Sequence, residues 1–131
     1  MEQQVDSSPL FVALRGAVQV AEDKPELIDC AINKLYEALL QANELTEAQL
    51  AMILITQTGD LSSRNPATGL RHGGHAITTP LFCMQELEIA GMLERVVRIM
   101  LVTNSPLDRP AVPVYMDGAE KLRPDFAPQK A

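Results

Sequence analysis

The sequence predicts an α+β domain: a mixed β-sheet with one long helix and short helical connections. One amphipathic stretch is long enough for a helix of about five turns, and it lies between two apolar stretches of strand length. The chain has 131 residues, the size of a single domain. Its composition is 47% hydrophobic and 21% charged, which excludes a disordered chain.

The long helix is predicted from Pro25 to Asn43. Proline suits the first turn of a helix, and the apolar residues that follow share one stripe at helical spacing: Leu27, Ile28, Ala31, Ile32, Leu35 and Leu39. Thr46 to Gln49 matches a capping box, so a short helical turn is expected there. A further brief helix is expected from Pro66 to Leu70.

Strands are expected where apolar and β-branched residues gather between turn-forming residues. These stretches are Leu10 to Val20, Ala51 to Gln57, Ile77 to Met84, Val96 to Thr103, and Val114 to Met116. We expect the first strand to end or bulge at Gly16. The second is continuously apolar, which predicts cover on both faces. Pro80 indicates that the third is an edge strand or enters the sheet irregularly.

Residues 9–126 are predicted to form this single domain, with a flexible arm at 1–8 and a tail at 127–131. One large helix covers only part of one face of a four- or five-stranded sheet. The remaining face needs cover, and other copies of the chain are its simplest source. A homo-oligomer is therefore expected.

Charge and cysteine content narrow the classes of function. The net charge of −6 argues on electrostatic grounds against a surface that binds nucleic acid or an anionic membrane. No run approaches the ~20 apolar residues of a membrane span, and the polar, acidic first residues do not resemble a secretory signal, so we expect a cytoplasmic protein. Two cysteines lack disulfide-scaffold or metal-site spacing, and His72 and His75 lack a third ligand. No metal or cofactor is expected.

Arg98 is the most unusual residue of the predicted sheet. In the strand from 96 to 103, alternate residues share a face, which places Arg98 in an apolar stripe with Val96, Met100 and Val102. Burying an unpaired guanidinium would cost several kcal/mol on the general scale for ions. Arg98 must therefore meet a carboxylate of the protein or of a ligand, unless it lies at an edge and reaches water.

Two further charged residues lie at predicted strand ends. Arg15 stands beside Gly16, and Glu86 follows the apolar run that begins at Pro80. Each residue alone is compatible with a solvent-facing strand end. Together with Arg98 they describe a pocket for an anionic small molecule that carries a hydroxyl group. Cys83 could act as a nucleophile, but a small buried side chain is the simpler interpretation.

Six segments in order resemble signatures of the AroH-type monofunctional chorismate mutases. They are Leu14-Arg15-Gly16-Ala17, Thr56-Gln57-Thr58-Gly59-Asp60-Leu61, Pro66-Ala67 with Arg71, Pro80-Leu81-Phe82-Cys83-Met84-Gln85-Glu86, Arg95-Val96-Val97-Arg98-Ile99-Met100, and Val114-Tyr115 followed by Leu122-Arg123-Pro124-Asp125. The matches span nearly the whole chain. The resemblance implies a ferredoxin-like α+β subunit, packed as a homotrimeric pseudo-α/β-barrel with active sites between subunits. It also implies the Claisen rearrangement of chorismate to prephenate, a step of phenylalanine and tyrosine biosynthesis that needs no cofactor.

The resemblance also implies roles for individual residues. Arg98 would donate to the ether oxygen of the substrate, Arg15 and Tyr115 would hold the side-chain carboxylate, and Glu86 would accept from the ring hydroxyl. The implied catalytic residues are thus Arg98, Glu86 and Arg15. The other implied substrate-binding residues are Phe82, Cys83, Met84, Gln85, Tyr115, Ala67, Arg71 and Leu122.

Three positions depart from the family pattern. Asn65 stands where an aromatic residue is common, Thr68 where a basic residue occurs, and Pro113 where a basic or polar residue is usual. Asn65 and Thr68 motivate an alternative, a non-catalytic trimeric module that binds a small carboxylate. A third interpretation is a trimeric enzyme acting on imines or enamines, but it does not explain Glu86 and Arg98 together.

Overall fold

The computed structural model describes residues 10–124, so the arm predicted at 1–8 and the tail predicted at 127–131 lie outside it. The elements along the chain are β1 (Ala13–Gln19), α1 (Pro25–Ala42), η1 (Glu47–Gln49), β2 (Leu50–Gln57), α2 (Pro66–His72), β3 (Leu81–Gln85), β4 (Val96–Thr103), β5 (Val114–Met116) and η2 (Ala119–Leu122). The α+β class, the long helix and five strands are as predicted. The third strand is shorter than predicted and begins only after Pro80.

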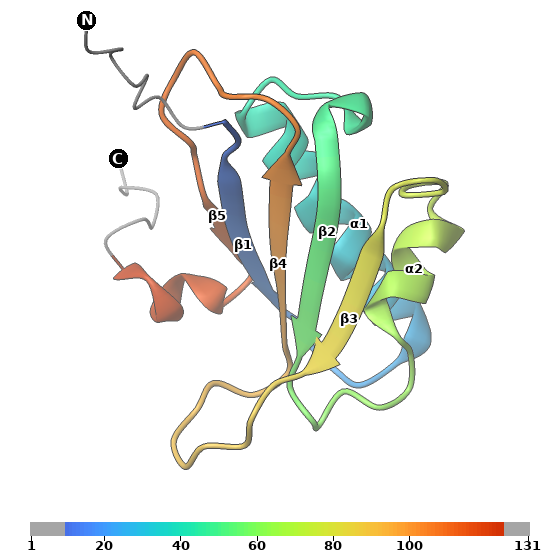
Figure 1. Cartoon of the computed structure of the whole chain (residues 1–131). Helices are drawn as coiled ribbons and strands as arrows, with labels where there is room; N and C mark the ends of the chain where they lie inside the picture. Colours follow the sequence, from blue (N-terminus) through green and yellow to red (C-terminus); the bar gives the residue numbers. More distant parts are fainter. Residues whose placement is uncertain (1–9, 125–131) are drawn as a thin grey trace, which may run out of the picture.

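The five strands form one mixed sheet in the order β3-β2-β4-β1-β5 (Figure 1). Strand β4 is central and pairs antiparallel with β1 on one side and β2 on the other. The edge strands β5 and β3 pair parallel with β1 and β2 respectively. Arg98, a residue of β4, therefore lies in the middle of the sheet, and an edge position for it is excluded.

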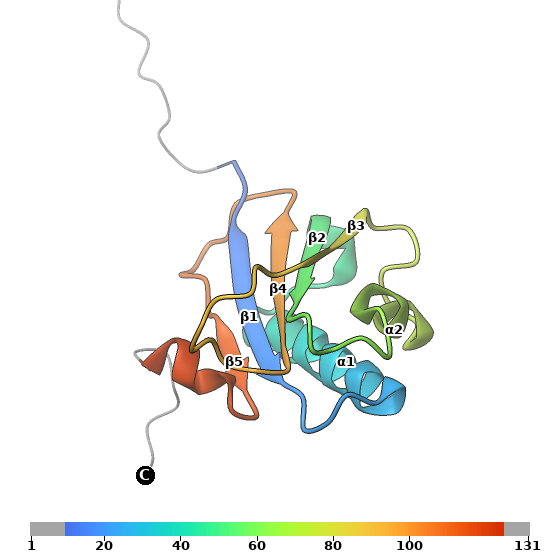
Figure 2. The same ribbon diagram turned by 90° about the horizontal axis from the view of Figure 1, so that it is seen from below.

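Helix α1 lies across one face of the sheet (Figures 1 and 2). Pro25 occupies its first turn, and its buried residues include five of the predicted apolar stripe together with Tyr36. They pack against the residues of the strands that point to the same side, among them Leu14, Ile55 and Leu101. The hydrophobic core is thus the layer between α1 and this face, which we call the helix face.

Alternation along the strands sends the other side chains to the opposite face, which we call the open face. It carries Arg15, Leu54, Thr56, Arg98 and Met100, which are exposed or only partly buried. The prediction that the strand at 51–57 is covered on both faces is therefore wrong for the single chain. In β2, Ile53 and Ile55 are fully buried, whereas Met52 is 42% exposed.

Gly16 does not interrupt its strand, contrary to the prediction. The register of β1 against β4 runs without a break from Ala13 to Gln19. A Cβ at Gly16 would lie 2.8 Å from Leu39 Cδ1 and 2.9 Å from the carbonyl oxygen of Val114. Glycine is required here because α1 and β5 approach the strand more closely than any side chain allows. Arg15 consequently lies within β1 and not at a strand end.

Replacing Gly16 with alanine should destabilise the fold by about 1–3 kcal/mol, because the backbone of β5 must move away to admit the methyl group. Ala13→Val, at an exposed position of the same strand, should change stability by less than about 0.5 kcal/mol. Urea unfolding at a fixed protein concentration measures both. Equal free energies of unfolding for the two variants would show that the close approach of α1 and β5 does not exclude a side chain at position 16.

Candidate active site

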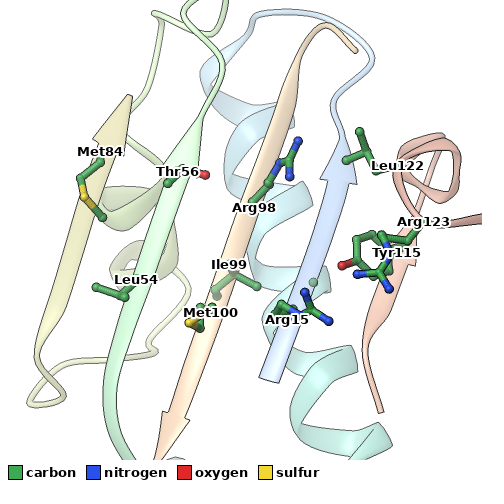
Figure 3. Close-up of a pocket in the computed structure, with 11 residues that line it drawn as sticks. Arg15, Leu54, Thr56, Met84, Arg98, Ile99, Met100, Tyr115, Leu122 and Arg123 are labelled. Atoms are coloured by element: carbon green, nitrogen blue, oxygen red, sulfur yellow. The ribbon is translucent and has the colours of Figure 1, made fainter. Parts of the chain in front are cut away.

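A pocket of about 370 Å³ opens on the open face of the sheet (Figure 3). Its lining comes from all five strands and from the segment after β5: Arg15, Gly16, Leu54, Thr56, Met84, Arg98, Ile99, Met100, Tyr115, Leu122 and Arg123. Of the predicted site residues, Arg15, Met84, Arg98, Tyr115 and Leu122 line it directly. The structure thus brings together five residues whose positions range from 15 to 122.

Arg98 projects from the middle of β4 onto the open face (Figure 3). Its register partners are Ala17 of β1 and Thr56 of β2. Both neighbours are small, so the guanidinium is not covered by either and keeps 49% of its side-chain surface exposed. A cation held on a rigid central strand and open to the pocket is suited to contact an anionic group of a ligand.

The carboxylate that Arg98 requires belongs to Glu86, which directly follows β3. Arg98 Nε lies 2.8 Å from Glu86 Oε1, and the Glu86 side chain is only 15% exposed. The backbone N–H of Glu86 donates to the carbonyl of Gln57, which fixes the chain at this point. The charge argument from the sequence is therefore confirmed: the arginine pairs with a carboxylate of the protein.

Arg15 and Arg123 add positive charge to the lining of the pocket. Arg15 lies on β1 opposite Met100, and Tyr115 lies on β5 opposite Ala17. In Figure 3, Arg123 and Tyr115 lie on the same side of the pocket as Arg15. Three arginines line the pocket, and only Arg98 of these is paired with the carboxylate of Glu86, so the pocket is suited to a small anion with more than one acidic group.

The start of β4 is fixed by a polar network at the end of β2. The side chain of Thr58 donates to Asp60 Oδ1 at 2.5 Å and accepts from the N–H of Val96 at 3.0 Å. Asp60 Oδ2 accepts from the N–H of Arg95 at 3.0 Å, and Arg95 has a positive φ of 51°. These bonds hold a backbone conformation that is costly for a non-glycine residue, three positions before Arg98.

The remaining predicted site residues do not line this pocket. Phe82 shares the open face but is 69% exposed beside it. Gln85 and Cys83 point the other way from Met84, and Cys83 packs against the core on the helix face. Ala67 and Arg71 lie on α2, which packs beside α1 and β3. In one chain, these last three residues are separated from the pocket by the sheet.

Cys83 lacks the surroundings of a nucleophile. Burial raises the pKa of its thiol, and the nearby N–H groups of Ala67 and Met84 offset this only in part. Neither histidine is its partner among residues 10–124: His75 contacts Glu37 at 2.9 Å, and His72 lies 3.8 Å from Asp29. The interpretation as a small, partly buried side chain fits this geometry.

Asn65 and Thr68, which depart from the family pattern, are both exposed, the first directly before α2 and the second within it. Asn65 is the N-cap of the helix, and its side chain accepts from the N–H of Ala67 at 2.8 Å. Its presence thus has a structural reason, because asparagine caps a helix better than an aromatic residue does.

Several pocket residues were missed by sequence reasoning, chiefly Leu54, Thr56 and Met100. Strand alternation could have found them, since each lies two residues from another open-face position or directly across from one. Within residues 10–124, no group of three metal-ligating side chains gathers. No helix of the same residues combines the length and apolar character needed to cross a membrane.

Comparison with known proteins places the chain in a family. The sequence model described as chorismate mutase type I matches residues 11–126. Chorismate mutase AroH of Thermus thermophilus is 39% identical over 117 residues, covering 86% of this chain and 93% of the relative. The Bacillus subtilis (strain 168) protein of the same name is 28% identical over 115 residues, covering 87% and 91%.

A solved structure agrees with these sequence matches. A chorismate mutase from Clostridium thermocellum superposes with a TM-score of 0.77 at 32% sequence identity, covering 84% of this chain and 98% of that one. The family resemblance seen in the motifs is thereby confirmed, and this chain belongs to the type I chorismate mutase family.

Proposed function

We propose that this enzyme catalyses the Claisen rearrangement of chorismate to prephenate in the pocket on the open face. The observation that carries the proposal is the central guanidinium of Arg98, paired with Glu86 and flanked by Arg15 and Tyr115. The substrate is a dicarboxylate that also bears a hydroxyl group. The pocket offers matching cations and a carboxylate acceptor, in a chain whose family carries the name of this activity.

Arg98 is proposed to act on the transition state. In the rearrangement, the C–O bond breaks ahead of C–C bond formation, and negative charge grows on the ether oxygen. A fixed donor aimed at that oxygen stabilises the transition state more than the ground state. Such a donor contributes about 3–4 kcal/mol, or ~10²–10³ in rate. No covalent intermediate is needed, in keeping with the surroundings of Cys83.

Arg15 and Tyr115 are proposed to hold the side-chain carboxylate of chorismate, while Glu86 accepts from its ring hydroxyl. The substrate must fold into a reactive conformer, and charges placed at both ends favour that conformer over the extended ones. The opposing positions of Glu86 and Arg15, on two different sides of the central strand β4, fit this task.

The active unit is proposed to be a homotrimer with its sites between subunits. The open face is apolar around the pocket, and Met52, Phe82, Met84 and Leu87 are all more than 40% exposed in the single chain. A neighbouring copy that covers this face would remove the apolar surface from water. It would also allow Ala67, Arg71 and Cys83 to contribute to the pocket of another subunit, since they cannot reach their own. A cytoplasmic setting is part of the same proposal.

The primary test is to mix the purified protein with chorismate and follow the loss of ultraviolet absorbance. Acid conversion of the product to phenylpyruvate identifies prephenate. Conversion well above the spontaneous rate is the expected result. A folded protein that binds a transition-state analogue but gives no acceleration would instead support the carboxylate-binding module.

Arg98→Ala should lower kcat by at least about 10²-fold with the fold intact, because the donor to the ether oxygen is lost. Arg98→Lys should also be poor, since a single ammonium does not reproduce the planar fork of the guanidinium. Arg109→Lys, in an exposed ion pair with Asp108, is the matched control and should retain full activity. Near-normal turnover of Arg98→Lys would contradict the proposed role.

Met52→Glu should reduce the mass in solution from that of roughly three chains to one and lower activity with it. A single chain tolerates the change because Met52 is exposed, whereas an assembly would bury the new charge without a partner. Ala42→Glu, at an exposed position of α1, introduces the same charge on the opposite side and should leave the mass unchanged. Sedimentation measures both, and an unchanged mass for Met52→Glu would refute assembly through the open face.

Iodoacetamide at neutral pH should label Cys30 faster than Cys83, by about tenfold or more. Cys30 is exposed, whereas burial raises the pKa of the Cys83 thiol and keeps it protonated. Mass spectrometry of labelled peptides gives both rates. Faster labelling of Cys83 would reveal a reactive thiolate and reopen a covalent mechanism.

A further inference from the structure

Side chains from two adjacent strands, β2 and β4, meet at a single oxygen atom of Glu86, the residue that follows β3. Thr56 of β2 lies opposite Arg98 of β4 and opposite Met84 of β3. Glu86 lies two residues beyond Met84, so its side chain returns to the same face. The topology therefore places the hydroxyl of Thr56 beside the guanidinium of Arg98 on the open face (Figure 3), and both reach the carboxylate of Glu86.

The hydroxyl of Thr56 donates a hydrogen bond to Glu86 Oε1 over 2.8 Å. The same oxygen faces Arg98 Nε at 2.8 Å. Oε1 of Glu86 is therefore held from two sides, by the ion pair with Arg98 and by the hydrogen bond from Thr56. Thr56 adds a directional restraint on this carboxylate from the β2 side.

That restraint matters because the ion pair has a competing geometry. A carboxylate next to one arginine is most stable when both of its oxygens face the guanidinium fork. In that arrangement Arg98 would direct two of its five N–H donors to Glu86, and each oxygen of Glu86 would have one acceptor position fewer for a substrate. A hydroxyl that fixes Oε1 on the β2 side opposes this collapse and leaves Oε2 and the outer nitrogens of Arg98 for a ligand.

We propose that Thr56 is a positioning residue that orients Glu86 to accept the hydroxyl group of the substrate and keeps Arg98 available to the ether oxygen. The inference rests on the proposed function for the identity of the substrate. Its structural basis, one hydroxyl that restrains one carboxylate, is independent of turnover. In this proposal Thr56 acts through Glu86 and Arg98.

Two substitutions at the same position separate the hydroxyl from the packing. Thr56→Val keeps the branched shape and removes the donor, whereas Thr56→Ser keeps the donor and removes a methyl group. Thr56→Val should lower kcat about tenfold while KM changes less than about threefold, because the catalytic groups are misplaced. Thr56→Ser should retain at least about a third of the wild-type kcat. If Thr56→Val does not fold, Thr56→Ala serves as the variant without a donor.

A binding measurement tests the inference without relying on catalysis. Two bicyclic dicarboxylate analogues of the transition state, one with the secondary hydroxyl and one without it, are titrated calorimetrically into each variant. The wild type should prefer the hydroxylated analogue by about tenfold or more, and Thr56→Ser should keep that preference. Thr56→Val should reduce it to less than about threefold, with little change for the analogue that lacks the hydroxyl.

Each outcome decides one question. If Thr56→Val keeps the full preference, or if Thr56→Ser loses it equally, Thr56 has only a packing role and the inference is overturned. If the wild type fails to convert chorismate but shows the preference and loses it in Thr56→Val, the proposed function fails and the positioning role stands. A loss of affinity for both analogues alike would also refute the role, since it would indicate a general distortion of the pocket.

Discussion

The open face of the sheet depends on one constraint, which is that the central strand β4 carries the permanently charged guanidinium of Arg98. Arg98 cannot be buried against a second helix layer without a large desolvation cost, so that face stays uncovered in the single chain. Glu86 supplies the opposing charge from the end of β3. The small side chain of Ala17 and the hydroxyl of Thr56 flank the cation across the two ladders. The pocket forms at this place because the side chain of Arg98 cannot be part of a hydrophobic core.

The fold was largely predictable because its main signals are local. The stripe of α1, the capping box at 46–49 and the apolar run of β4 each lie within one element, where periodicity decides the structure. Gly16 was misread because a glycine in a strand suggests a break, whereas its cause is the approach of Leu39 and Val114 from distant parts of the chain. The prediction that both faces of β2 are covered was wrong for the single chain. Apolar residues on both faces of a strand do not reveal whether the same chain supplies the layer that packs on each face.

The candidate site was predictable in part, from charge. Arg98 and Glu86 stood out as charged residues beside apolar runs, and the structure pairs them. Tyr115 and Leu122 entered only through the family resemblance, since nothing local distinguishes them. Thr56 stood in a signature segment but received no role, because threonine is ordinary in strands and its partner Glu86 is 30 residues away. Ala67, Arg71 and Cys83 also entered through the resemblance, and no local sequence signal tells that the sheet separates them from the pocket of their own chain.

The two sides of the pocket lie on strands that are held in the sheet by very different numbers of paired residues. Arg98 is carried by a strand that is paired along its length on both sides, whereas Tyr115 belongs to β5, which joins the sheet through three paired residues at its edge. Opening free energies within a protein are lowest where few ladder bonds and little core hold the chain. Hydrogen exchange should therefore be fast along β5 and slow along β4. A ligand could then enter and leave at the β5 side of the pocket while the ion pair of Arg98 and Glu86 keeps its geometry at the other side.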